Sequence, residues 1–182
     1  MPGLYGGGAE DVVLKLADGF NSRDMSIDLV VVKGEGELQA CVPSNVNVVD
    51  LDAGRIATSL VPLIRYIRCV RPSVLISTLT PTNVISILAN IAAGWSTAIV
   101  LTEQNTKSTQ LERKNLRTRL FIIAAKFTYS WANQIVAASN QIADDLCSAI
   151  QFEREKVEVV YNPVFSEGLH RKADEEVDHP WF

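Results

Sequence analysis

Histidine is nearly absent from this chain of 182 residues. Its only two histidines are His170 and His179, so residues 1–169 contain none. A Ser-His-Asp triad needs an imidazole beside its nucleophile, and most catalytic zinc sites use imidazole ligands. The sequence therefore argues against both chemistries, and we expect no metal site and no bound cofactor.

Cysteines and long apolar runs are also scarce. Cys41, Cys69 and Cys147 are widely spaced and form no Cys-x-x-Cys motif, which predicts three reduced, mostly buried thiols. The longest apolar runs, such as Leu120–Ala125, are far shorter than the roughly 20 residues that span a bilayer. The first residues do not combine a basic segment with an apolar one, so no signal peptide is predicted. We expect a cytoplasmic protein.

Charge is distributed unevenly along the chain. The net charge is −4, yet the segment Arg55–Lys126 holds ten basic and two acidic residues, a balance of +8 that leaves −12 for the remainder. Such an asymmetry predicts one surface that faces an anionic partner.

Short β-branched runs alternate with helical patterns. Strands are predicted at Ile27–Val32, near Val46–Val49, and at Val74–Ser77, Thr97–Thr102, Gln134–Ala137 and Val157–Val160. Helices are predicted at Glu10–Phe20, Ile56–Val70, Thr82–Ala93, Glu112–Trp131 and, after the Ser139 cap, up to Ile150. This order specifies an α/β fold, a Rossmann-like doubly wound parallel sheet with helices on both faces.

The beginning of this pattern is irregular. A doubly wound fold opens with a central strand, but only Met1–Tyr5 precede the first glycines. We predict a truncated first strand, with either a native start further upstream or a fragment cut at both ends. Residues 1–165 are expected to form one domain, and 166–182 a loose acidic tail leading to an absent second domain.

The segment Gly6-Gly7-Gly8-Ala9-Glu10 stands where the first strand turns into a helix. Glycines there let a ligand approach the backbone, and a helix N-terminus attracts anions, although a plain tight turn explains them equally well. Asp11 occupies the third glycine position of the dinucleotide fingerprint, and Lys33 stands where an acidic residue would bind the ribose. Both argue against the alternative of a dinucleotide-dependent enzyme.

Four segments in order resemble glycosyltransferase family 4, which has the GT-B fold. They are Gly7-Gly8-Ala9-Glu10, Thr102-Glu103-Gln104-Asn105-Thr106, Ile135–Ser139 with Ala143–Leu146, and Val159–Val164. His179–Phe182 is similar to the start of that family's second domain. The resemblance implies a metal-independent retaining enzyme whose C-terminal domain binds a nucleotide-sugar. The N-terminal domain would bind the acceptor and close its glycine loop on the donor phosphates.

The resemblance and the sheet geometry place the same residues in one cleft, because ligands bind beyond the carboxyl ends of parallel strands. The expected donor-phosphate loop is Gly6, Gly7, Gly8 and Glu10; the expected acceptor cleft is Thr80, Asn83, Glu103, Gln104, Asn105 and Ser139; the expected interdomain hinge is Asn162 and Pro163. Glu103 is expected to accept hydrogen bonds from sugar hydroxyls. Gln104 replaces a histidine common in the family, and it cannot act as a base.

Simpler roles remain open for several of these residues. Glu103 and Asn105 can cap a turn, Asn162-Pro163 can be a hinge only, and Trp95 and Trp131 can be packing residues rather than sugar platforms. The chain is predicted to be the N-terminal half of a hexosyltransferase acting on a glycan or lipid-linked acceptor, inactive without its donor domain. The alternative is a non-catalytic membrane-associated or scaffolding module. No nucleic-acid partner is expected.

A basic cluster surrounds the predicted helix Glu112–Trp131. It comprises Lys107, Arg113, Lys114, Arg117 and Arg119, with the apolar residues Leu116, Leu120, Phe121 and Ile122 interleaved. By helical periodicity, one stripe runs along the same helix and consists of Leu116, Leu120, Ile123, Phe127 and Trp131. One interpretation is a core-packed helix with a solvated basic face. The other is a surface that docks on anionic lipid at the inner face of the membrane.

Overall fold

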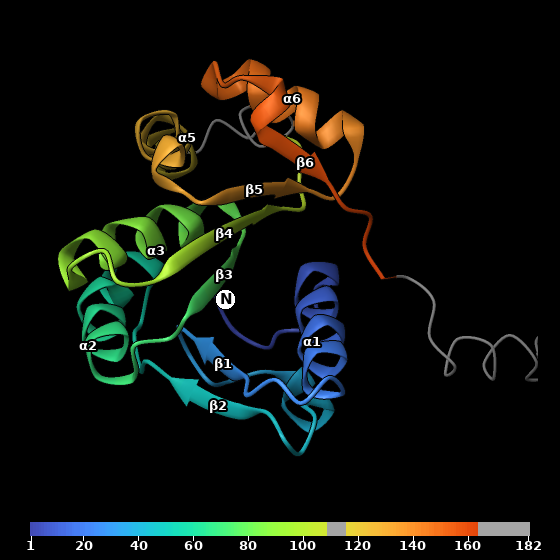
Figure 1. The fold of residues 1–182 in the computed structure, drawn as a ribbon, viewed down its shortest axis with the longest axis vertical. Helices are drawn as coiled ribbons and strands as arrows, with labels where there is room; N and C mark the ends of the chain where they lie inside the picture. The colour runs from blue at the N-terminus through green and yellow to red at the C-terminus, as the bar shows by residue number, and fades with distance from the viewer. Residues whose placement is uncertain (109–115, 164–182) are drawn as a thin grey trace, which may run out of the picture.

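The computed structural model describes residues 1–108 and 116–163. Six strands run along these residues (Figure 1): β1 Asp28–Val31, β2 Asn47–Asp50, β3 Val74–Thr78, β4 Ala98–Glu103, β5 Gln134–Ala137 and β6 Val157–Val159. The first and last residues of each strand lie within two residues of the predicted bounds. All strand pairs are parallel, so the predicted α/β class with a parallel sheet is confirmed.

The helices of the described residues follow the strands as expected. They are α1 Gly8–Asn21, α2 Leu60–Val70, α3 Thr80–Ala93, α5 Leu116–Thr128 and α6 Asn140–Ile150. Short 3₁₀ turns precede α2 at Ile56–Ser59 and follow α5 at Tyr129–Trp131. Ser139 caps α6 as predicted, because its Oγ accepts a hydrogen bond of 3.2 Å from the amide of Ile142. The first predicted residues of α5, 112–115, lie outside the described residues.

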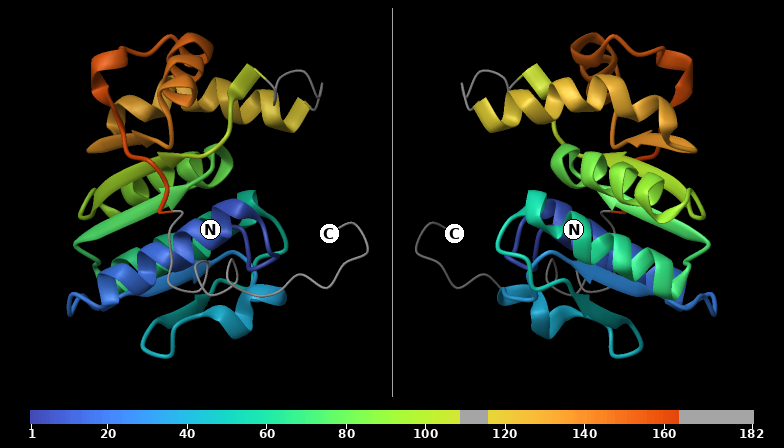
Figure 2. Two further views of the ribbon diagram at one scale, coloured as in Figure 1. Left: turned by 90° about the vertical axis from the view of Figure 1, so that its right-hand side faces the viewer. Right: turned by 90° about the vertical axis from the view of Figure 1, so that its left-hand side faces the viewer.

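The sheet is divided into two parts. Strands β3-β4-β5-β6 form a four-stranded sheet in that order, and β1 and β2 form a separate pair. Figure 1 shows the β1-β2 pair and α1 at one end of the molecule, and Figure 2 shows the four-stranded sheet with its helices stacked beyond them. A doubly wound sheet would have one more strand between β1 and β3. Among the described residues no strand lies between β1 and β3, in agreement with the truncated first strand that the short opening segment predicts.

Three apolar clusters match this division. The largest joins the four-stranded sheet to α3, α5 and α6 and includes Ile99, Leu101 and Tyr129. A second holds α1 against β1 and includes Leu14 and Val31. The third lies between α2 and α3. Helices thus cover the strands from more than one side, which is typical of a parallel sheet.

A short amino-terminal segment replaces the opening strand. The Met1 amino group donates a hydrogen bond of 2.9 Å to the Val30 carbonyl, and the Val32 amide donates one of 3.0 Å to the Met1 carbonyl. Further along this segment, the Leu4 carbonyl accepts a hydrogen bond of 2.9 Å from the Leu38 amide. Gly36, two residues before Leu38, has a φ of +140°. A side chain at Gly36 would overlap the Leu4 backbone, so the turn needs glycine there.

The expectation of mostly buried thiols was wrong, and of the two interpretations of the long helix the core-packed one does not hold for its apolar stripe. Cys41 and Cys69 are exposed rather than buried, and Cys147 is half-buried. The stripe of α5 also faces outward: its five members are 45% to 69% exposed. The opposite face of α5, with Ile122 and Ala125, packs in the core instead. No helix among the described residues is long and apolar enough to cross a membrane.

Candidate functional site

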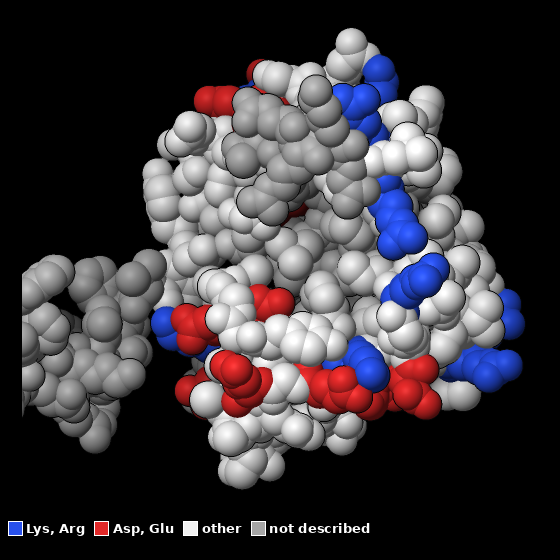
Figure 3. All heavy atoms as spheres, turned by 180° about the vertical axis from the view of Figure 1, so that it is seen from behind, with Lys and Arg blue, Asp and Glu red and all other residues white. Residues whose placement is uncertain are grey.

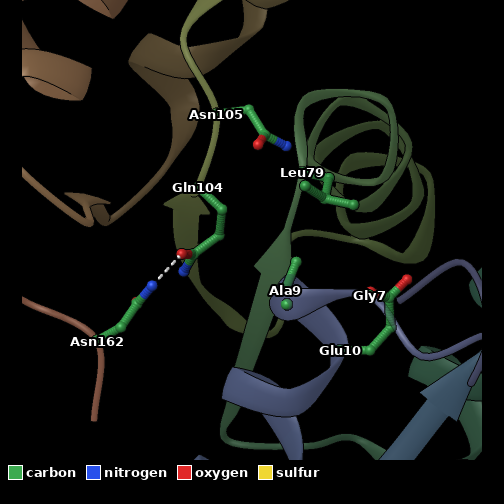
Figure 4. A pocket seen from close by; sticks show the side chains of 8 residues that line it. Gly7, Ala9, Glu10, Leu79, Gln104, Asn105 and Asn162 are labelled. Carbon is green, nitrogen blue, oxygen red and sulfur yellow. Dashed lines mark hydrogen bonds between the residues drawn. The ribbon is translucent and has the colours of Figure 1, made fainter. Parts of the chain in front are cut away.

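A cavity of about 420 Å³ lies where four chain segments meet at the carboxyl ends of the strands. Figure 4 shows α1 on one side of it, the end of β3 behind it, and the segment after β4 facing the chain that leaves β6. Its lining residues are Gly7, Gly8, Ala9, Glu10, Leu79, Gln104, Asn105 and Asn162. Ligands bind at this edge in open α/β sheets, so the cavity occupies the expected position.

The glycine loop supplies one wall of the cavity. Gly6 has a φ of +94°, a conformation that side chains rarely adopt, and it turns the chain into α1. Gly7 is the N-cap of α1 and offers no side-chain cap to the first-turn amides. The Glu10 carboxylate lies against Gly7. The loop therefore presents backbone donors and one carboxylate acceptor to the same space.

Leu79 forms the floor between β3 and α3 in a strained conformation. Its φ is +71°, which is unusual for a large side chain. Its amide donates a hydrogen bond of 3.2 Å to the Thr102 carbonyl, and its carbonyl accepts one from the Asn83 amide. Strained residues of this kind gather at binding sites, and Leu79 has no sequence signal that would reveal it.

Gln104 and Asn162 close the remaining side. The Asn162 Nδ2 donates a hydrogen bond of 2.7 Å to the Gln104 Oε1, the bond drawn in Figure 4. This bond joins the residue after β4 to the segment expected to be the hinge. Asn162 is therefore part of the cavity wall as well as part of that segment, which the sequence did not indicate.

Glu103 does not line the cavity, contrary to its expected role with sugar hydroxyls. It is 1% exposed, and its carboxylate accepts bonds from Lys107, Tyr129 and Thr80. The Lys107 Nζ lies 2.5 Å from Glu103 Oε2. Because both oxygens already have partners, Glu103 acts as a buried anchor beneath the site.

Lys107 does not face the surface either, contrary to its expected place in the membrane-facing cluster. It is completely buried, and its Nζ also donates a bond of 3.1 Å to the Asn105 carbonyl. Its backbone amide donates to Asp145 on α6. Lys107 thus fixes the loop carrying Gln104 and Asn105 from below, so that these two amides have a defined position in the cavity.

Tyr129 completes this buried network. Its hydroxyl donates to Glu103 and accepts a bond of 3.2 Å from Asn83. Burial, reinforced by the Glu103 carboxylate, raises the pKa of the Tyr129 hydroxyl well above its ordinary value. The hydroxyl therefore stays protonated and remains a donor. Sequence reasoning missed Tyr129, which stands 26 residues beyond Glu103.

The other expected cleft residues are placed as follows. Thr80 and Asn83 are buried below the floor and belong to the Glu103 network rather than to the cavity surface. Ser139 is occupied as the α6 cap. Among the described residues, no group of three or more His, Cys, Asp and Glu side chains is placed to hold a metal ion.

Only part of the basic cluster lies within the described residues. Arg117 and Arg119 are exposed on α5, whereas Arg113 and Lys114 lie outside the described residues. Figure 3 shows Lys and Arg side chains in a band along one side of the molecule, and Asp and Glu side chains at the β1-β2 end. Trp95 and Trp131 are about half exposed and stack edge to face, with ring centroids 6.3 Å apart, rather than packing in the core.

A Rossmann-like parallel sheet with a polar cavity at its carboxyl edge places this protein in the class of α/β ligand-binding domains. The model of glycosyltransferase family 4 matches residues 6–167, and the chain belongs to this family as an N-terminal domain. A solved lipopolysaccharide outer core galactosyltransferase, WaaB in its apo form, has the same fold, with a TM-score of 0.62 and 14% identity. The match covers 89% of this chain but 44% of that one. No curated protein sequence matches the chain.

Proposed function

We propose that this domain is one wall of a sugar-transfer site, which moves a hexosyl group from a nucleotide-sugar to a glycan or lipid-linked acceptor. The observation that carries the proposal is the cavity composed of Gly7–Glu10, Gln104, Asn105 and Asn162. Its polar groups are amides, backbone donors and one carboxylate. Such groups suit a ligand rich in hydroxyls, because each hydroxyl both donates and accepts a hydrogen bond.

We further propose a division of roles within the cavity. Glu10, Gln104 and Asn105 would orient sugar hydroxyls, and the uncapped amides at Gly6–Gly8 would meet the donor phosphates. The Glu10 carboxylate now lies against Gly7 and would repel a phosphate there, so it must move when the donor binds. The second wall would be a donor-binding domain that follows the Asn162-Pro163 hinge. Transfer with retention at the anomeric carbon is part of the same proposal.

The test uses binding and turnover on the chain as it stands. We expect millimolar hexose disaccharides to shift the amide NMR signals of Gly7, Gly8, Gln104 and Asn105. We also expect no release of UDP from UDP-glucose or UDP-galactose, because catalytic positioning needs both walls of the cleft. Asn105→Ala should weaken disaccharide binding at least threefold. Asn140→Ala, an exposed amide on α6, is the matched control.

Three results would contradict this proposal. Signal changes confined to residues away from the cavity would show that saccharides bind elsewhere. Sustained UDP release by this chain alone would show that the second wall is not needed. Equal loss of binding in Asn105→Ala and Asn140→Ala would remove the assigned role of the Gln104–Asn105 loop.

A second candidate function, docking at the cytoplasmic face of a membrane, is favoured by the geometry of α5. At about 100° per residue, Leu116, Leu120, Ile123 and Phe127 fall within about 60° of the helix circumference. Arg119 and Lys126 lie on one side of this stripe, Arg117 lies on the other, and all three side chains are exposed. An apolar stripe with basic flanks is the pattern of helices that lie in a membrane interface.

A further inference from the structure

Asn105 is the most exposed of the three side-chain amides that line the polar cavity. Gln104 and Asn162 are half-buried and bonded to each other, whereas Asn105 is exposed. A side chain that projects from a loop into solvent is held little by packing, so its position depends on how firmly the backbone around it is held. The backbone bonds on either side of Asn105 therefore decide how well this amide is placed for a ligand.

Asp145 of α6 holds the backbone just beyond Asn105. Its Oδ2 accepts a hydrogen bond from the Lys107 amide, and its Oδ1 accepts one of 3.2 Å from the Ser108 amide. Residues 107 and 108 are the first helical residues after the loop, so these amides have no partner inside their own turn. A carboxylate placed across such amides makes charge-assisted bonds and complements the positive end of the helix dipole. Asp145 is thus a helix cap supplied by a different helix.

The helix that carries Asp145 is firmly held. The inner face of α6, with Ala143 and Leu146, is buried in the largest apolar cluster. The preceding carboxylate, Asp144, is 69% exposed and pairs at 2.7 Å with Arg154. The two neighbouring aspartates of α6 therefore differ in their contacts: one forms a surface ion pair, and the other reaches the loop that carries Asn105.

The loop is held between two anchors. From the buried side, the Lys107 Nζ donates a bond of 3.1 Å to the Asn105 carbonyl, and Asp145 accepts from the amide two residues further on. The Lys107 side chain is completely buried and paired with Glu103, so the fold depends on this first anchor. Asp145 is only half-buried. Its removal should therefore free the loop while the core stays intact.

We propose that Asp145 is a positioning residue of the polar cavity, which acts through the amides of Lys107 and Ser108 to hold Asn105 where it meets a saccharide. This role rests on the proposed binding of hydroxyl-rich ligands in the cavity. Asp145 does not line the cavity and does not touch the ligand. Its effect is preorganisation, because a loop that is already in place loses less conformational freedom when a ligand binds.

The test compares the two neighbouring aspartates by NMR titration with lactose and maltose. Asp145→Ala should weaken disaccharide binding at least about fivefold, and Asp145→Asn, which keeps one acceptor oxygen, at most about twofold. Asp144→Ala is the matched control: it loses only a surface ion pair and should bind as the original chain does. All three variants should stay folded, with Tm within about 4 °C of the original chain.

Hydrogen exchange gives a second measurement that needs no ligand. In Asp145→Ala, the amides of Lys107 and Ser108 should exchange at least about fivefold faster, while the amide of Ile135 in β5 should not change. This measurement separates the positioning role from the proposed function. If no chain binds a disaccharide, the proposed function fails, and faster exchange confined to Lys107 and Ser108 still supports Asp145 as the residue that holds the loop.

Several outcomes would overturn the proposal. Unchanged exchange at Lys107 and Ser108 would show that the bonds to Asp145 do not restrain the loop. Disaccharide binding by Asp145→Ala equal to that of the original chain would show that the cap does not place Asn105. Equal weakening in Asp145→Ala and Asp144→Ala would assign the effect to the charge of α6. A fall in Tm beyond about 10 °C in both Asp145 variants would assign Asp145 to folding instead.

Discussion

The ammonium of Lys107 lies 2.5 Å from the carboxylate of Glu103, and neither side chain reaches solvent. A buried charge pair is costly to break, because removing one partner leaves the other charge desolvated and alone. This pair stands directly beneath the loop that carries Gln104 and Asn105. The polar cavity therefore depends on an electrostatic contact between two residues that do not line it.

Lys107→Met is expected to lower the free energy of unfolding by about 3 to 5 kcal/mol, because Glu103 would remain buried without its cation. Urea denaturation measures the change. Lys126→Met, an exposed lysine on α5, should change stability by no more than about 0.5 kcal/mol. A Lys107→Met chain as stable as this control would mean that Glu103 is protonated or solvated in the folded protein.

Stability of the chain that starts at Met1 should rise between about pH 6 and pH 8. Burial lowers the pKa of the Met1 amino group from 8.0 to about 6, although Glu10 partly opposes this. In that range the unfolded chain binds the proton and the folded chain does not, so unfolding becomes less favourable as the pH rises. A shift of two units corresponds to about 2 to 3 kcal/mol. Urea midpoints at several pH values should show this slope, and acetylation of the amino group should abolish it.

Gly36→Ala is expected to cost at least about 2 kcal/mol of unfolding free energy. The φ of +140° disfavours any side chain, and the new methyl group would overlap the Leu4 backbone. Gly54→Ala is the matched control, since a side chain there meets no atom within 4 Å. Thermal melts of both variants test the contrast. Similar melting temperatures would show that the amino-terminal segment moves away from Gly36 at little cost.

Vesicle flotation tests the α5 surface. The protein should bind anionic vesicles more tightly than neutral ones, and about 1 M salt should release it because the Debye length falls to about 3 Å. Leu120→Gln combined with Phe127→Gln should reduce binding at least fivefold. Val61→Gln, an exposed apolar position on α2, should not. Equal binding to both vesicle types, or binding that survives high salt, would contradict docking by charge.

The strands could be predicted from the sequence because short aliphatic runs between helical patterns have few other solutions. The Rossmann-like class followed from their order, and the position of the cavity followed from the strand ends. The roles of Glu103 and Lys107 could not be predicted in the same way. Glu103 ends β4 and Lys107 follows it by four residues, and the burial of this pair depends on Tyr129, which comes from the turn after α5.

The apolar stripe on α5 shows a different limit of prediction from sequence. Periodicity groups Leu116, Leu120, Ile123 and Phe127 on one face, but it does not say whether that face turns toward the core. The weaker opposite face, with Ile122 and Ala125, is the one that packs. Ile122 and Ala125 belong to the core cluster that joins the four-stranded sheet to α3, so tertiary packing, and not the more hydrophobic stripe, sets the orientation of α5.

The division of the sheet has a consequence for cooperativity. No ladder of backbone hydrogen bonds crosses from β1 to β3 within the described residues, so the two halves are coupled mainly through α2 and α3. Regions joined by few backbone bonds open at lower free energy than a continuous sheet. The β1-β2 unit with α1 should therefore unfold as a separate segment while the four-stranded sheet stays folded. The glycine loop belongs to this less stable unit, whereas Gln104 and Asn105 belong to the more stable one. Unfolding of the less stable unit would therefore separate the two walls of the polar cavity while the four-stranded sheet is still folded.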